Sequence, residues 1–400
     1  MPPRSRSSSL SRTSQTLIAL AEALSRSGSF LEDRYWESCL SEALDKALSA
    51  RHGRAVETAL DVLLEQRSAA YELLVELAEA RSESLTPAPD APDHDTLLIS
   101  APILAWTRYR LPPGQLDAAQ LRALEALMAK TVLGPQAQVT LLPALIRFDR
   151  LPQSFQETRT WTQALAQRIL GQRRDGPALR DAEAPDDLLA DVFFLIGAVV
   201  VPRGAPVFQW QSPPPSEAPS QEAITEQWAQ GCAPILESSF TGCQLEYLRP
   251  QSYYTGTRQA DQGIRPLVLK AAATWLQTAA RIPGTDLRAA MVACGDQSIE
   301  EYRIGFCTRQ SNDVIYGCVW PALSREESQP DPDTEDQADT WDTIAALLRE
   351  CGVQDIRRLP GLHPVEFCED CGTPYFPNML GEMQHPELPE EIDPEPVQFH

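Results

Sequence analysis

Apolar residues recur every three or four positions through the first eighty residues of the chain. The spacing begins with Leu17, Leu20, Ala21 and Leu24, and Gly28 follows where such a helix would end. Three more helices are predicted by the same spacing, at residues 31–48, 56–64 and 71–78. Short connections make such helices antiparallel neighbours. We therefore predict a helical subdomain over residues 14–84, preceded by a disordered tail at residues 1–13.

Beyond residue 95 the pattern alternates between β-rich runs and amphipathic helices. The predicted order is strand, helix, strand and helix, at residues 96–105, 116–130, 137–148 and 155–170. An apolar segment follows at residues 188–201, and its periodicity fits a buried strand and a buried helix equally. These elements form a first α/β region over residues 95–210.

A second α/β region is predicted over residues 220–362. It contains helices at 224–235 and 264–280, a strand at 243–248, a three-stranded meander at 287–320, a helix at 341–351 and a strand at 353–359. Proline-rich stretches at 86–92 and 211–219 separate the regions, because each proline restricts itself and the residue before it.

The fold class predicted from these elements is α+β. A helical subdomain precedes two mixed α/β regions, and a zinc-knuckle-like turn with an acidic tail occupies residues 363–400. Both α/β regions contain a strand-helix-strand unit that ends in Arg-Leu-Pro, at Arg150–Pro152 and at Arg358–Pro360. This shared ending raises a degenerate duplication as a hypothesis.

Composition narrows the classes of function. The formal net charge of −22 opposes binding to a phosphate backbone, so nucleic acid is not the expected partner. A membrane span would need about 18 consecutive apolar residues, and the sequence has no such run. Nine cysteines, an odd number without a secretory signal, favour reduced thiols in the cytoplasm.

The segment Cys368-Glu-Asp-Cys371-Gly372 is a candidate metal-binding turn. Two thiolates separated by two residues, with glycine after the second, have the spacing of half a tetrahedral zinc site. His363 and His385 are the predicted remaining ligands, with His400 as a poorer candidate. A thioredoxin-like role is disfavoured, because Glu369 and Asp370 should raise the thiol pKa values and prolines interrupt the following segment. The other reading is a pair of free thiols in a turn.

A second candidate is the polar-aromatic stretch that contains Tyr253, Tyr254 and Arg258. It could line a ligand cleft, and it could equally be an ordinary loop between a strand and a helix. The sequence contains no glycine-rich phosphate loop, no nucleophile elbow and no His-Glu-x-x-His pair.

Two local patterns resemble a known group of sequences. They are Ser27 to Glu37, which reads SGSFLEDRYWE, and Phe367 to Asn378 with the following Gly381 to His385. Together they resemble an uncharacterised proteobacterial family of about this length, which carries a domain-of-unknown-function label. The resemblance implies a conserved cytoplasmic role and supplies no reaction, substrate or catalytic residue.

Two hypotheses of function follow. In the first, the protein is a non-enzymatic binding or regulatory protein with a structural zinc knuckle and a protein partner. In the second, it is a metal-dependent or small-molecule enzyme whose site lies between the two α/β regions, near Tyr253, Tyr254 and Arg258. A pocket with convergent charged groups would favour the second hypothesis, and a filled seam would count against it.

The charge generates the first testable prediction. We expect only weak affinity for mixed-sequence DNA or RNA, because each contact adds repulsion where nucleic-acid proteins release counterions. Fluorescence anisotropy at physiological salt checks this. Submicromolar binding with a steep dependence on salt concentration would contradict the prediction and reveal a basic surface that overrides the net charge.

Overall fold

The computed structural model describes residues 10–49, 54–86, 94–107, 114–172, 175–179, 189–211, 217–328 and 340–388. Several predicted segments therefore lie wholly or partly outside the described residues. They are the N-terminal tail, the two proline-rich stretches, the acidic loop before residue 340 and the C-terminal tail with His400.

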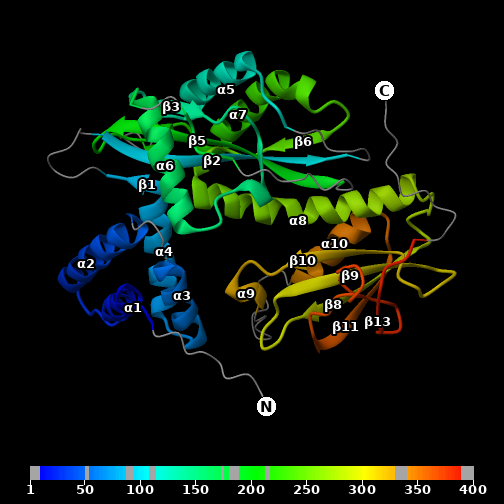
Figure 1. Ribbon diagram of the computed structural model, residues 1–400. Helices are drawn as coiled ribbons and strands as arrows, with labels where there is room; N and C mark the ends of the chain where they lie inside the picture. Colours follow the sequence, from blue (N-terminus) through cyan, green and yellow to red (C-terminus); the bar gives the residue numbers. More distant parts are fainter. Residues whose placement is uncertain are drawn as a thin grey trace.

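The N-terminal helices form a packed bundle (Figure 1, blue). They are α1 (Arg12–Ser25), α2 (Phe30–Ser49), α3 (Ala55–Glu65) and α4 (Ala70–Glu83). Leucines from all four helices are buried in one core: Leu17, Leu40, Leu44, Leu63 and Leu74. The Ser11 side chain accepts a hydrogen bond from the Ser14 backbone N–H and caps α1. The predicted helical subdomain is confirmed, and its first helix begins inside the predicted tail.

Two long antiparallel strands organise the first sheet. β2 (His94–Trp106) and β5 (Ala190–Pro202) pair along their whole length, so the ambiguous apolar segment is a strand. Shorter strands flank this pair: β1 (Ser84–Leu85), β3 (Gln138–Leu141), β4 (Ile146–Arg147), β6 (Gln244–Tyr247) and β7 (Gln251–Ser252). Both central strands are almost continuously buried, because helices cover both faces of the sheet.

The two faces of this sheet build separate cores. One face packs against α5 (Ala118–Thr131) and α7 (Gln221–Leu236), with Ile103 and Phe193 beside the fully buried Trp228. The other face packs against α6 (Phe155–Ile169) and α8 (Tyr253–Thr278), with Phe194 and Ile196 in contact with this layer. Alternate residues of one strand thus enter different cores, and a three-layer arrangement results.

The structure corrects the boundary predicted at 211–219. α7, β6 and β7 belong to the first sheet and its covering layer, although the prediction assigned residues 220–362 to the second region. This correction follows from the pairing of β6 with β2, in which Tyr247 lies opposite Ile103. The chain therefore stays with the first sheet beyond residue 217, and the change of sheet occurs within α8.

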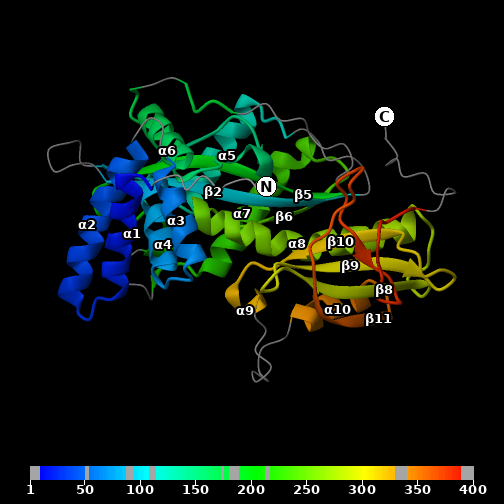
Figure 2. The ribbon, with the colours of Figure 1, turned by 60° about the horizontal axis from the view of Figure 1, so that its bottom comes forward.

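The second sheet has the strand order β10-β9-β8-β11 (Figure 2). Its strands are β8 (Leu287–Cys294), β9 (Glu301–Thr308), β10 (Tyr316–Pro321) and β11 (Asp355–His363). The predicted meander is confirmed for β8 to β10, which pair antiparallel, and β11 joins β8 in parallel. The short helix α9 (Arg325–Ser328) and α10 (Thr340–Glu350) precede β11.

The two Arg-Leu-Pro segments adopt different local structures. The first begins at the end of a 3-10 turn, η1 (Phe148–Arg150), ahead of α6. The second lies within β11, where the pairing register shifts between Arg358 and Leu362. The first sheet is antiparallel and the second contains a parallel pair. These differences give no support to the duplication hypothesis.

Helix α8 is shared by the two sheets (Figure 1). Its first half buries Tyr253 and Ala260 in the core on the first sheet, and its second half buries Leu269, Trp275 and Leu276 in the core on the second. The sequence predicted this helix from residue 264. The structure begins it at Tyr253, so the supposed cleft or loop at 253–258 is its opening turns.

The N-terminal bundle is attached to the start of α8 by the half-buried carboxylate of Glu83. Glu83 Oε2 accepts a hydrogen bond from the Tyr254 backbone N–H at 2.9 Å, where a helix leaves its first N–H groups without intrahelical partners. Nearby, the Tyr254 hydroxyl lies 3.1 Å from the hydroxyls of both Ser82 and Thr158. Burial raises the pKa of Glu83 to about 7, and the hydrogen bond from Tyr254 opposes the rise.

The second testable prediction concerns Glu83. Its pKa is raised from 4.5, so its stabilising contribution is fully present below pH 4.5 and is lost as the pH rises through about 7. When the pH is raised from 5 to 8, the free energy of unfolding of Glu83→Gln should rise by about 2 kcal/mol or more relative to that of the natural protein, because an amide has no charge to bury. Urea unfolding at the two pH values measures this difference.

The matched control is Glu76→Gln, which changes an exposed carboxylate on the same helix. It should shift the free energy of unfolding by a similar small amount at both pH values. Equal behaviour of the two variants would show that Glu83 is not the titrating contact.

Candidate metal centre

A short hairpin carries one side of the candidate centre. It consists of β12 (Phe376–Pro377) and β13 (Met383–Gln384), which pair antiparallel. Asn378 closes the turn, since its Oδ1 accepts hydrogen bonds from the backbone N–H groups of Leu380 at 2.8 Å and Glu382 at 3.0 Å. Gly381 has a φ of +94°, which a residue with a side chain rarely adopts. The chain therefore reverses tightly after residue 377.

The two cysteines lie in a second tight turn, just before this hairpin. Phe367 and Pro374 form an isolated antiparallel bridge at its base. Within the turn, Cys368 donates its N–H to the Thr373 carbonyl at 2.8 Å, and Gly372 donates to the Cys368 carbonyl at 2.9 Å. Gly372 has a φ of +72°, so the glycine after the second cysteine has the conformational role that the spacing implied.

The hairpin register brings a histidine to the cysteines. Phe376 pairs with Gln384, so His385, the next residue along the chain, is directed toward the cysteine turn. Its Nε2 lies 3.2 Å from Cys371 Sγ. The ligand atoms of Cys368, Cys371 and His385 all lie within 4.8 Å of one another. Two thiolates and an imidazole at this separation suit a tetrahedral ion with bonds of about 2.0–2.3 Å.

His363 is not a member of this group. It ends β11, pairs in register with Cys294, and its carbonyl accepts a hydrogen bond from the Gly295 N–H at 2.9 Å. An extended strand advances about 3.3 Å per residue, so proximity in sequence does not return its side chain to the cysteines. Within the described residues, the four predicted ligands therefore reduce to a convergent group of three.

Hydrogen bonding lowers the pKa of the exposed thiol of Cys371. The pKa of Cys371 is lowered, first because the Thr373 hydroxyl oxygen lies 3.2 Å from its Sγ and second because the Thr373 backbone also bonds to it. The charge of Asp370 acts in the opposite direction with a smaller effect. The sequence argument, which let the intervening acidic residues raise this pKa, is corrected by a hydrogen bond it could not see.

The buried cysteines behave differently. Burial raises the pKa of Cys294 and of Cys307 to about 11, and it also raises the pKa values of Cys232 and Cys318. All four are members of apolar cores. Thiols in such surroundings pack as small apolar groups and are poor ligands or nucleophiles.

A buried arginine of the second sheet forms hydrogen bonds to both ends of the cysteine turn. Arg303 on β9 is 0% exposed, and its Nη1 donates to the carbonyls of Glu366 at 2.6 Å and Tyr375 at 2.8 Å. These carbonyls stand on the two chain segments that enter and leave the turn. Its Nε pairs with Glu301 at 2.6 Å, which offsets the buried charge. Sequence reasoning missed Arg303, although an arginine inside the apolar strand Tyr302-Arg-Ile-Gly-Phe306 is an available signal.

Two glycines let the hairpin lie directly on the second sheet. A Cβ atom at Gly305 of β9 would collide with the Pro377 carbonyl, and one at Gly317 of β10 would collide with the Phe376 ring. The bare backbone at these positions permits the approach. Phe376 and Met379 consequently enter a core with residues of β8 and β9.

The other candidate residues serve the packing of α8. Tyr253 is buried in the first-sheet core, and Arg258 forms an ion pair with Glu79 of α4 at 2.7 Å. Tyr254 bonds to Ser82 and Thr158. The polar groups of Tyr254 and Arg258 thus bind other parts of the same chain.

The model of a family described as "Protein of unknown function (DUF2863)" matches residues 2–399. No curated protein and no solved structure matches the chain.

The third testable prediction concerns Arg303. Arg303→Met should destabilise the protein by about 3–5 kcal/mol, because Glu301 loses its buried partner and two carbonyls lose their donor. Chemical unfolding measures the loss. Arg309→Met, which changes an exposed arginine just after β9, is the control and should change stability by less than about 0.5 kcal/mol. Equal small effects in the two variants would contradict the role of Arg303 in holding the cysteine turn.

Proposed function

This chain belongs to the DUF2863 family, whose description assigns no activity, and we propose from the geometry of its knuckle that it is a cytoplasmic zinc-binding protein. The metal has a structural role, and the protein acts by non-enzymatic binding or regulation with a protein partner. The observation that carries the proposal is the convergence of Cys368, Cys371 and His385 within 4.8 Å.

The donor set favours zinc among the common metals. Two sulfurs and one imidazole nitrogen are soft or borderline ligands, whereas calcium and magnesium take oxygen ligands. The turn around Cys368 and the hairpin before His385 are both held by backbone hydrogen bonds, so the ligands need little rearrangement to close on an ion. A fourth donor or a water molecule would complete a tetrahedral coordination.

A structural role fits the position of the knuckle. A metal here would link the turn at 368–371 to His385 and so close a loop that encloses the β12–β13 hairpin. This hairpin places Phe376 and Met379 in the core on the outer face of the second sheet. Two small strands hold little hydrophobic surface of their own, and a metal cross-link is the usual compensation in such modules.

A binding role, as opposed to catalysis between the two regions, is supported by the internal contacts at the start of α8. Tyr253, Tyr254 and Arg258, which would have lined the enzyme site, instead join the bundle and the first sheet to α8. The hydroxyl of Tyr254 and the guanidinium of Arg258 are engaged by Ser82, Thr158 and Glu79 of the same chain.

The fourth testable prediction is the metal content. Protein purified in reducing buffer should contain about one zinc per chain, because three ligands are already in place. Cys371→Ser and His385→Gln should each lower the content strongly and lower the thermal stability. Inductively coupled plasma mass spectrometry measures the zinc, and thermal unfolding measures its effect.

Two matched variants control this test. Cys39→Ser changes a half-buried cysteine on α2, and His363→Gln changes the histidine that lies outside the group. Both should retain the metal. A zinc content near zero in the natural protein, unchanged by Cys371→Ser, would contradict the proposal. If the natural protein contains zinc and chelation removes it without lowering the thermal stability, the structural role is contradicted.

A further inference from the structure

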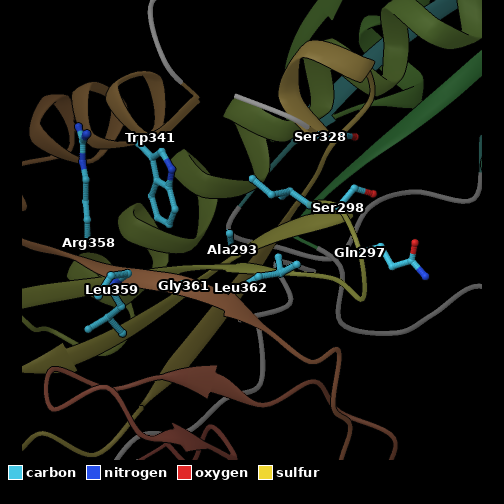
Figure 3. A pocket seen from close by; sticks show the side chains of 11 residues that line it. Ala293, Gln297, Ser298, Ser328, Trp341, Arg358, Leu359, Gly361 and Leu362 are labelled. Atoms are coloured by element: carbon cyan, nitrogen blue, oxygen red, sulfur yellow. The ribbon is translucent and has the colours of Figure 1, made fainter. Parts of the chain in front are cut away.

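A cavity of about 540 Å³ opens where β8 and β11 end (Figure 3). β11 contributes the largest share of its wall, with Arg358, Leu359, Pro360, Gly361 and Leu362. Ala293 of β8, Trp341 of α10 and Ser328 of α9 line the other sides, together with the loop at 297–299 that follows β8. Elements distant in the sequence thus meet around one space.

The position of the cavity is one where ligands bind in open α/β sheets. β8 and β11 run parallel, and the lining residues Ala293 and Leu362 stand opposite each other near the carboxyl ends of these strands. Crevices outside the carboxyl ends of parallel strands are the usual binding sites in such folds. A volume of this size also lies within the range of about 300–1,000 Å³ found for small-molecule sites.

An irregularity in β11 shapes the wall. The parallel register with β8 shifts between Arg358 and Leu362, so the intervening residues have no regular partner on β8. Gly361 has a φ of +93° in this segment. The strand therefore bends where it borders the cavity, and backbone groups that a regular ladder would use are left for other partners.

Among the residues that the structure describes, the lining combines apolar surface with one charged side chain. Trp341, Ala293 and Leu362 supply the apolar part, and Arg358 is the charged side chain among the lining residues. Arg358 is paired with Asp342, but the two side chains are 40% and 62% exposed. An ion pair so exposed contributes little stability, so the carboxylate of a ligand can replace that of Asp342 at little cost.

We propose that this cavity binds a small organic carboxylate with an aromatic or branched apolar body. The guanidinium of Arg358 holds the carboxylate through two parallel hydrogen bonds, a geometry that favours arginine over lysine. The apolar body packs against Trp341 and Leu362. This binding site is separate from the proposed zinc site, since none of its lining residues belongs to the ligand group.

The test uses 4-phenylbutyrate and its uncharged amide, 4-phenylbutyramide, with the full chain as purified. Isothermal titration calorimetry should show binding of the acid, and the amide should bind about tenfold more weakly because it lacks the charge-assisted contact. Arg358→Met should abolish this preference for the acid. Leu362→Trp changes a side chain that is 42% exposed. The larger side chain should fill the cavity and weaken the binding of both probes.

Arg357→Met is the matched control on the same strand. The Arg357 guanidinium bonds to the Met379 carbonyl of the hairpin, and Arg357 is absent from the cavity lining. It should leave both affinities unchanged. Zinc content measured for each variant separates a loss of the cavity from a loss of the metal site.

Three results would overturn the proposal. They are the absence of measurable binding of phenylbutyrate, equal affinity of the acid and the amide in the natural protein, and undiminished binding after Leu362→Trp. Zinc binding can persist in all three cases, so the cavity can fail while the proposed metal function stands.

Discussion

The rest of the structure depends on one helix being shared by two sheets. α8 has 26 residues and spans about 39 Å at 1.5 Å per residue, which is long enough to cover part of each sheet. Its first half approaches β2 closely at Gly256, where an added Cβ atom would collide with the Ser100 side chain. Its second half places Trp275 and Leu276 in the second core. The two cores therefore cannot separate without exposing the helix that both of them use.

The two ends of this helix have different surroundings. The bundle attaches to its first turn through Glu83, Tyr254 and Arg258, so that junction is occupied by internal contacts. The second sheet is left with one face against α8 and α10 and the other against the β12–β13 hairpin. β11 links the two proposed sites, since the residues that line the cavity are followed within a few positions by Cys368.

The knuckle shows how a local motif relies on distant support. Cys368, Cys371 and Gly372 form their turn through contacts that lie within six residues. The turn is fixed on the sheet by Arg303, more than sixty residues earlier, whose buried charge is balanced by Glu301. Buried charge is costly unless it is paired and hydrogen-bonded. The placement of this arginine under the turn therefore ties the geometry of the ligands to the correct folding of the sheet.

The sequence by itself determined the features that arise from neighbouring residues. The bundle follows from helical spacing, the meander from apolar runs separated by turn residues such as Gln310–Asp313, and the cysteine turn from its own spacing. Tertiary structure decided which sheet α7 and β6 join, where α8 begins, and that His385 and not His363 meets the cysteines. It also decided the role of Arg303 and the cavity beside Arg358. Those outcomes depend on strand register and on packing between distant segments, and periodicity within one segment carries no information about either.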